Sequence, residues 1–388
     1  MAFDTSLLAR IDRHLAKYVD DGRLPGWQVQ VAQHGEVVHA STYGLADLES
    51  GRPVAADTLW RIYSMTKPLT SVLAMMLWEE GEFQLTDEVS RWIPSFAEAR
   101  VFDKGSAASP FLVPAVEPVR MWHLLTHSAG LTYGFMQVHP VDALYRAQGF
   151  EFAWPAGFDL AASTDAWARL PLKFQPGSAF GYGVSTDVLG RVIEVITGKR
   201  LDEAMQERVL GPLGMTDTRW FVEGADVERT AALYAAFDGK AVRYDVLGDA
   251  AFREPLGHSG GGGLISTAAD YQRFMDAVLD GSLLAPRTLE LMTRNHLPGD
   301  LAQCNSGGFA ETVLDGIGFG LGFAVVMDPV PSRSASSVGE FYWGGLASTA
   351  FWIDPATGVT ASFYTQLVPS STYPIRAELR QLVYGALR

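Results

Sequence analysis

The chain has 388 residues, 48% of them hydrophobic and 19% charged, and its 44 acidic and 30 basic residues give a net charge of −14. This composition excludes a disordered chain and predicts a large buried core. The acidic balance, without any run of Lys or Arg, is unfavourable for binding nucleic acid. The single cysteine, Cys304, excludes an internal disulfide and a cysteine-based zinc or iron–sulfur site.

The N-terminal segment predicts an amphipathic helix rather than a targeting signal. Leu7, Ile11 and Leu15 recur at helical spacing with charged residues between them, without the basic start and apolar stretch of a secretory signal. The sequence also lacks the roughly 18 consecutive apolar residues that a transmembrane helix needs. We therefore expect a cytoplasmic protein with no membrane partner.

Strands are predicted near both ends of the chain. Two of them, 27–33 and 36–43, are joined at His34-Gly35, where Gly35 supplies the positive φ of a tight hairpin turn. Further strands are predicted at 322–327, 341–343, 349–353 and 359–364, before a closing helix at 374–387.

Helical patterns dominate the middle of the chain. They cover 65–80, 122–127, 186–197 and 201–209, and the stretch 93–119 is interpreted as loop. The predicted fold class is α/β (α+β): an antiparallel sheet from both chain ends, flanked by helices, with a large and mainly helical insertion. The predicted domains are 1–63 with 250–388, and 64–249, with the active site at their interface.

Ser64 and Lys67 form an S-x-x-K motif at the start of a predicted helix. This spacing puts both side chains on one helix face, about 5–6 Å apart at Cβ. A serine hydroxyl becomes an effective nucleophile when a base takes its proton, and a lysine can be that base when burial lowers its pKa. Because Pro68 is tolerated only in the first helical turn, the helix begins near Ser64 and leaves backbone N–H groups for an oxyanion.

Ser259 is a second candidate nucleophile, because residues 257–261 match the G-x-S-x-G pattern of α/β-hydrolases. That pattern needs a buried strand before the serine and a helix directly after it. Pro255 interrupts the preceding segment and Gly262-Gly263 follow, so neither condition is met. An α/β-hydrolase using Ser259, a later aspartate and His296 remains an alternative, and it requires a parallel sheet.

His123 and His127 are spaced as a metal-binding pair would be on one helix face. No third ligand is evident near them in the sequence, so core or hydrogen-bonded histidines are the favoured interpretation. The sequence also lacks a phosphate-binding loop. We expect neither a metal nor a cofactor.

Five motifs together resemble those of the serine β-lactamase-like superfamily, and within it the class C β-lactamase-like carboxylesterases of esterase family VIII. In chain order they are Trp60 to Lys67, His123 to Leu131, Pro176 to Tyr182, Pro212 to Thr218, and Trp343-Gly344-Gly345. Their order and spacing match the family over nearly the whole chain.

The resemblance implies that Ser64, Lys67 and Tyr182 form the catalytic centre. Ser64 would attack the ester, and either Lys67 or Tyr182 would take its proton and return it to the leaving alcohol. A nearby lysine ammonium favours the ionised form of Tyr182. The resemblance also implies an oxyanion hole made by the backbone N–H groups of Ser64 and Leu346.

Two positions depart from the β-lactamases of this superfamily. Those enzymes have Asn where this chain has Val184, and Lys-Thr-Gly where it has Trp343-Gly344-Gly345. The missing lysine removes the cation that would hold a substrate carboxylate, and Trp343 offers apolar area instead. Both differences favour neutral esters, and W-G-G is the form typical of the esterases. We expect four residues at these two positions to contact substrate, namely Val184, Trp343, Gly344 and Gly345.

Aromatic residues after the second motif predict walls of the substrate site, namely Tyr133, Phe135 and the loop 150–154. The sequence thus predicts a serine carboxylesterase that cleaves short-chain esters through an acyl-enzyme on Ser64. The alternatives are β-lactam or D-amino-acid peptide hydrolysis, acyl transfer to another acceptor, and a non-catalytic ligand-binding protein. The expected partner is a small-molecule ester, and the oligomeric state is not defined by the sequence.

Overall fold

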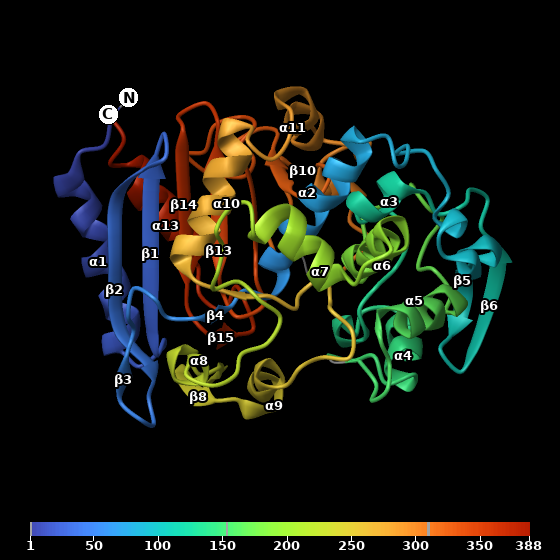
Figure 1. Ribbon diagram of the computed structural model, residues 1–388, viewed down its shortest axis with the longest axis horizontal. Coiled ribbons are helices and arrows are strands. Elements are labelled where there is room, and N and C mark those ends of the chain that lie inside the picture. Colours follow the sequence, from blue (N-terminus) through green and yellow to red (C-terminus); the bar gives the residue numbers. More distant parts are fainter. Residues whose placement is uncertain (1, 153, 309–310) are drawn as a thin grey trace.

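The computed structural model describes residues 2–152, 154–308 and 311–388. An eight-stranded antiparallel sheet forms its largest element, with strand order β10-β11-β12-β13-β14-β1-β2-β3. In Figure 1 the blue N-terminal strands lie beside the red C-terminal strands, and the two chain ends meet. Ala2 and Arg388 exchange backbone hydrogen bonds of 2.9 Å there. The predicted sheet built from both chain ends is confirmed.

The strands of this sheet are β1 (Gly26–Gln33), β2 (Glu36–Asp47), β3 (Arg52–Pro53), β10 (Ile317–Phe319), β11 (Ala324–Val326), β12 (Phe341–Gly344), β13 (Ala350–Asp354) and β14 (Val359–Tyr364). The turn between β1 and β2 has φ of 51° at His34 and 79° at Gly35, as the predicted hairpin requires. Every strand pairing in the sheet is antiparallel. The parallel sheet of the α/β-hydrolase alternative is therefore wrong.

The helices that matter for the site are η1 (Tyr63–Met65), α2 (Thr66–Glu79), α3 (Met121–Leu125), η4 (Gly134–Met136), α4 (Pro140–Ala147), α5 (Leu160–Arg169), α6 (Ser185–Thr197), α7 (Leu201–Met205) and α10 (Ala268–Asp280). The terminal helices α1 (Thr5–Asp20) and α13 (Ile375–Tyr384) pack together beside the sheet. Most helices of the middle of the chain form the green half of the molecule in Figure 1.

The two faces of the sheet are covered by different helices. Arg380 of α13 lies 5.0 Å from the ring of Trp352, whereas Tyr271 of α10 packs 5.1 Å from the ring of Phe351. Because neighbouring residues on a strand point to opposite faces, α13 and α10 cover opposite faces. Trp343 is paired with Phe351 across the strands, so its side chain points to the α10 face.

The stretch 93–119 corrects one prediction, because it is not all loop. β5 (Arg100–Ser106) and β6 (Ser109–Pro114) form an antiparallel hairpin. Most residues of both strands are exposed or half-buried, so the hairpin lacks the apolar alternation that marks a half-buried strand in a sequence. A second hairpin, β7 (Tyr234–Phe237) with β8 (Lys240–Arg243), pairs with β15 (Leu367–Val368).

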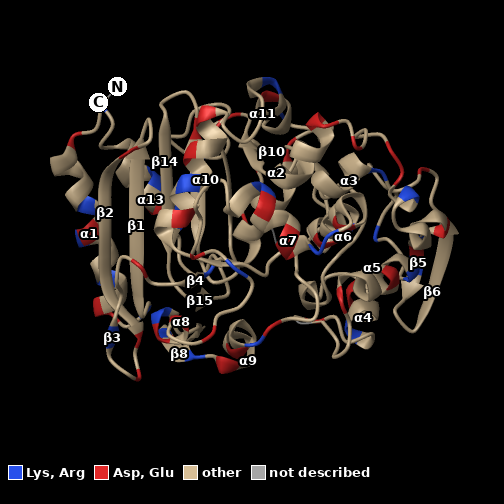
Figure 2. Ribbon diagram, in the orientation of Figure 1, with Lys and Arg blue, Asp and Glu red and all other residues tan. Residues whose placement is uncertain are grey.

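Charged residues lie mostly outside the central strands. Figure 2 shows acidic and basic residues interspersed along helices such as α1 and α10, while β1, β11, β12 and β14 carry none. Among the described residues, no helix combines the length and the apolar character needed to cross a membrane.

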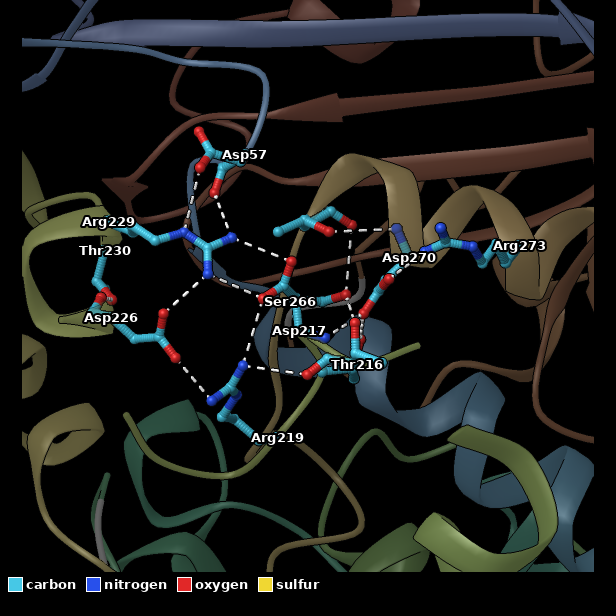
Figure 3. A network of polar contacts seen from close by, with 12 residues as sticks. Asp57, Thr216, Asp217, Arg219, Asp226, Arg229, Thr230, Ser266, Asp270 and Arg273 are labelled. Atoms are coloured by element: carbon cyan, nitrogen blue, oxygen red, sulfur yellow. Dashed lines mark hydrogen bonds and ion pairs between the residues drawn. The ribbon is translucent and has the colours of Figure 1, made fainter. Parts of the chain in front are cut away.

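The fourth sequence motif ends in an ionic network (Figure 3). Asp217 accepts hydrogen bonds from Arg229 at 2.9 and 3.0 Å and from Arg219 at 3.3 Å, and its backbone N–H donates to Asp270 of α10 at 2.8 Å. Arg229 chiefly holds the pKa of Asp217 below its usual range. The network therefore joins the 216–230 segment to α10.

The same network supports the strand that precedes Ser64. The backbone of Arg219 bonds in both directions with Ile265, at 3.0 and 2.7 Å. Ile265 belongs to β9 (Ile265–Ser266), which pairs with β4 (Trp60–Arg61). The charged network thus braces the chain on its way into the nucleophile turn.

Asp217→Ala is expected to lower the free energy of unfolding by about 2 kcal/mol, since it removes three hydrogen bonds from Arg229 and Arg219 and leaves Asp226 as the carboxylate that they share. The effect is present at neutral pH and declines in acid, where the carboxylate of the wild type takes up a proton. Urea unfolding followed by circular dichroism measures it. The exposed Asp103→Ala serves as control, and equal midpoints for both variants would show that the network contributes nothing.

Candidate active site

Ser64 lies in the short turn η1, between β4 and α2. The preceding Tyr63 has φ of 43°, a left-handed conformation that is unfavourable for a large side chain and makes the turn sharp. Ser64 is 9% exposed and Lys67, in the first turn of α2, is 1% exposed. The Lys67 Nζ donates to the Ser64 Oγ at 3.2 Å, so the two residues of the S-x-x-K motif meet as predicted.

Lys67 Nζ makes three further contacts. It donates to the Tyr133 hydroxyl at 2.9 Å and to the Gly261 carbonyl at 2.6 Å, and it lies 4.7 Å from the centre of the Tyr182 ring. Burial lowers the pKa of Lys67 to about 8, and the carboxylates of Asp187 and Glu311 oppose this shift. A substantial fraction of Lys67 is therefore neutral at slightly alkaline pH.

Tyr182 lies just before α6, and its hydroxyl accepts a hydrogen bond from the Trp343 Nε1 at 3.2 Å. Burial first, and the charge of Glu311 second, raise the pKa of Tyr182 well above its usual value, against hydrogen bonds with Ser64 and Trp343. This direction is opposite to the one expected from the lysine ammonium alone, and the choice between Tyr182 and Lys67 as the base stays a prediction. Desolvation of the phenolate is the largest cause of the shift, and it favours the protonated form of Tyr182.

The strand end Trp343-Gly344-Gly345 lies against the nucleophile turn. A Cβ at Gly345 would lie 2.4 Å from the carbonyl oxygen of Ile62, so only glycine fits there. A Cβ at Gly344 would lie 2.5 Å from the Arg376 guanidinium, which bonds to the Gly345 carbonyl at 3.1 Å. Close packing therefore explains both glycines, against backbone at Gly345 and against the Arg376 side chain at Gly344, and their predicted contact with substrate stays untested.

Leu346 follows this strand and packs in a small apolar cluster that includes Tyr63, the residue before Ser64. The structure thus brings the two predicted oxyanion-hole residues, Ser64 and Leu346, onto adjacent segments. Their role stays a prediction. Val184 is the N-cap residue of α6 and is 5% exposed, and its predicted contact with substrate also stays untested.

Ser259 does not lie in a nucleophile elbow. Its Oγ donates to the carboxylate of Asp187 at 2.5 Å, and the Gly261 N–H donates to the same oxygen at 3.0 Å. His258 is held instead by Asp202 at 3.2 Å, and the ring of His296 bonds to the Leu291 carbonyl at 2.9 Å. The Ser259 alternative therefore lacks its histidine.

The glycine-rich segment 260–263 contributes to the site through its backbone, because the Gly261 carbonyl accepts a hydrogen bond from Lys67. Asp187 fixes the Gly261 peptide from the other side, and a Cβ at Gly261 would lie 2.5 Å from its carboxylate. Burial raises the pKa of Asp187, while Lys67 lowers it. The hydrogen bonds from Gly261 to Asp187 and from Lys67 to Gly261 thereby fix the position of the lysine.

The two histidines of the second motif have separate environments. His123 Nδ1 accepts from the Arg120 N–H at 3.0 Å, whereas the ring of His127 packs 5.0 Å from that of Tyr182. Burial lowers the pKa of both. Within residues 2–152, 154–308 and 311–388, no group of three or more His, Cys, Asp or Glu side chains is arranged to hold a metal ion.

Several site residues were not predicted in these roles. Tyr133 was expected as a wall, yet its hydroxyl binds Lys67, and Asp187 and Gly261 were not expected in the site at all. The sequence offered one signal for Asp187. It is an acidic residue among the apolar positions of the predicted helix 186–197, where a carboxylate would be buried. Phe135 stacks on Tyr133 at 4.9 Å. Within the predicted aromatic loop 150–154, residue 153 lies outside the described residues.

Comparison with known proteins places the whole chain in one family. The beta-lactamase family model matches residues 11–385, and the chain belongs to this family. Among its relatives, Protein Rv1367c of Mycobacterium tuberculosis is 34% identical over 90% of this chain and 88% of that protein. Esterase EstB of Burkholderia gladioli is 32% identical over 98% of this chain and 96% of that protein.

A solved structure agrees with the sequence relatives. EstCE1, described as a hydrolase with promiscuous acyltransferase activity, has a TM-score of 0.85 and 28% identity, covering 98% of this chain and 99% of that chain. The predicted β-lactamase-like fold and the resemblance to the esterases of this superfamily are confirmed.

Proposed function

We propose that the chain is a serine carboxylesterase that cleaves neutral, short-chain carboxylic esters through an acyl-enzyme on Ser64. The observation that carries this is the contact between the Ser64 hydroxyl and a buried lysine whose pKa lies near 8. The esterase relatives support the same class of reaction, and placement in esterase family VIII belongs to the proposal. So does a cytoplasmic location, with which the lone buried thiol of Cys304 is compatible.

In the first half-reaction Lys67 acts as the base. Neutral Lys67 takes the Ser64 proton as the serine oxygen attacks the ester carbonyl, and the N–H groups of Ser64 and Leu346 bind the oxyanion. The tetrahedral intermediate collapses, the C–O bond to the alcohol breaks, and the leaving oxygen receives the proton from Lys67. Tyr182, whose hydroxyl oxygen accepts hydrogen bonds from Ser64 and Trp343, keeps its own proton in this scheme.

The second half-reaction repeats these steps with water. Neutral Lys67 takes a proton from the water that attacks the acyl-enzyme, and the released Ser64 oxygen takes that proton back. Trp343 stands where a lysine would bind a substrate carboxylate, and its ring is buried against Tyr182 at 5.3 Å. An ester without a negative charge therefore suits this site.

The pH dependence tests the assignment of the base. Because only neutral Lys67 accepts the Ser64 proton, kcat/KM is expected to rise about tenfold per pH unit at low pH and to level off above an apparent pKa of about 8. The measurement is kcat/KM for p-nitrophenyl butyrate between pH 6 and 9.5, corrected for spontaneous hydrolysis. A profile that is flat across this range would contradict a lysine base.

Acyl transfer is the second candidate function, since EstCE1 is described as having promiscuous acyltransferase activity. The same acyl-enzyme serves both reactions, and only the acceptor differs. Vinyl butyrate with increasing methanol distinguishes them by the yields of methyl butyrate and butyric acid. Methyl ester in excess of the spontaneous reaction supports transfer, and butyric acid alone supports a hydrolase.

A further inference from the structure

Three aromatic rings form a continuous stack that leads from Lys67 to the surface. Tyr133 and Phe135 stack at 4.9 Å with an interplanar angle of 16°, and Phe135 and Phe152 stack at 5.2 Å with an angle of 2°. The inner end is the Tyr133 hydroxyl on Lys67, and the outer ring, Phe152, is 51% exposed. We call these three residues the aromatic ladder.

The ladder is held in place by the backbone of the two loops that carry it. Gly134, between Tyr133 and Phe135, lies so close to Phe150 that a Cβ there would be 2.2 Å from the Phe150 carbonyl oxygen. The guanidinium of Arg146 on α4 donates to the Gly134 carbonyl. Because both loops are fixed against one another, the rings are ordered before any ligand arrives, which lowers the entropy cost of binding.

Further apolar side chains follow Phe135 on the same loop. Val138 is 57% exposed, and both Val138 and Met136 lie beside Gly308, at 3.4 and 3.6 Å from the position of a Cβ there. The exposed side chains of Phe152 and Val138 lie on the loops that carry the ladder, and such exposed apolar groups suit a bound apolar group.

The chemistry of proton return indicates which part of an ester meets the ladder. The leaving alcohol oxygen must come within hydrogen-bond reach of Lys67 to receive its proton. Tyr133 is bonded to that same ammonium, so the substituent on the alcohol oxygen starts next to the innermost ring. We propose, on the basis of the esterase function above, that the aromatic ladder binds a flat aromatic group on the alcohol side of the ester.

This binding has a selectivity that simple apolar burial lacks. Benzyl and cyclohexylmethyl groups bury similar apolar area, but only the benzyl ring gains the face-to-face attraction of stacked aromatic rings. The ladder therefore prefers benzyl acetate to cyclohexylmethyl acetate, by about three- to tenfold in kcat/KM. The acyl group of both substrates is short, in keeping with the proposed function.

The test compares this benzyl to cyclohexylmethyl ratio in the full-length wild type and three variants. Phe152→Leu keeps the apolar bulk and loses the flat ring, so the ratio is expected to fall at least threefold, and Phe152→Tyr is expected to restore it. Phe111→Leu is the matched control, because Phe111 is similarly exposed, at 55%, and its ring on β6 lies under Lys104 rather than against the ladder. It is expected to leave the ratio and the activity unchanged.

Four results would overturn the inference. The first is an equal loss for both esters in Phe152→Leu, which indicates a structural role only. The second is a selective loss with methyl phenylacetate against methyl cyclohexylacetate, which places the aromatic group on the acyl side. The third is a wild type that turns over neither these esters nor ethyl acetate, which removes the proposed function as well. The fourth is hydrolysis of ethyl acetate by the wild type together with the same benzyl to cyclohexylmethyl ratio in every variant. That result overturns the proposal for the aromatic ladder and leaves the esterase function standing.

Discussion

Replacing Ser64 with alanine is expected to lower kcat for p-nitrophenyl butyrate by about 10⁴-fold or more, because no acyl-enzyme can form without the serine oxygen. The residual rate comes from substrate binding and the remaining polar groups alone. Steady-state assays with highly purified protein measure the loss, and the thermal unfolding midpoint shows that the fold is kept.

Ser259→Ala is the matched control for this variant. Its hydroxyl bonds to Asp187, which positions Lys67 through Gly261, so its removal is expected to lower kcat by about tenfold, far less than the loss in Ser64→Ala. The Ser64 assignment would be wrong if Ser64→Ala kept more than a tenth of wild-type activity, or if Ser259→Ala were the inactive variant.

Lys67→Gln has the second large expected effect. It removes the base that takes the Ser64 proton, and a lost general base costs about 10²–10⁴-fold in kcat/KM. Gln is close to Lys in length and neutral, so it fits the buried position, although the buried carboxylate of Asp187 loses a neighbouring cation. The measurement is kcat/KM from pH 6 to 9.5, in which the rise near pH 8 is expected to disappear.

The exposed Lys104→Gln is the control for Lys67→Gln, since it removes a lysine of the same charge far from the site. Wild-type activity and the same pH profile are expected for it. If Lys67→Gln instead retained the wild-type pH profile at a reduced rate, Tyr182 rather than Lys67 would be the titrating base.

Those parts of the fold that depend on a short stretch of sequence, such as turns, strands and helix starts, could be predicted. The His34-Gly35 turn, the apolar strands of the C-terminal third and the start of α10 at Thr267, whose hydroxyl accepts from the Asp270 N–H at 3.2 Å, all carry local signals. The β5–β6 hairpin was missed because its strands have no buried face over most of their length. The division into two domains stays a prediction.

The candidate site could be predicted only in part, since some of its contacts join distant positions. Ser64 and Lys67 are local neighbours, and Tyr182 and Trp343 entered through motifs. The contacts of Lys67 with Tyr133 and Gly261 join residues 66 and 194 positions apart. No local pattern encodes such pairs, because tertiary packing creates them.

The protonation state of Tyr182 also depends on tertiary structure and could not be predicted from the sequence. Proximity of Lys67 suggested that Tyr182 loses its proton readily, but the sign of the shift depends on burial, which only the folded structure gives. The same burial lowers the pKa of Lys67, so both shifts point to lysine as the base.

The central claim is that Ser64 carries the acyl group, and labelling of the wild-type protein with a fluorophosphonate tests it most directly. Intact mass should show one adduct per chain, and peptide mapping should place it on Ser64. A single adduct on Ser259, or continued ester hydrolysis by protein that takes up no adduct at all, would contradict this account.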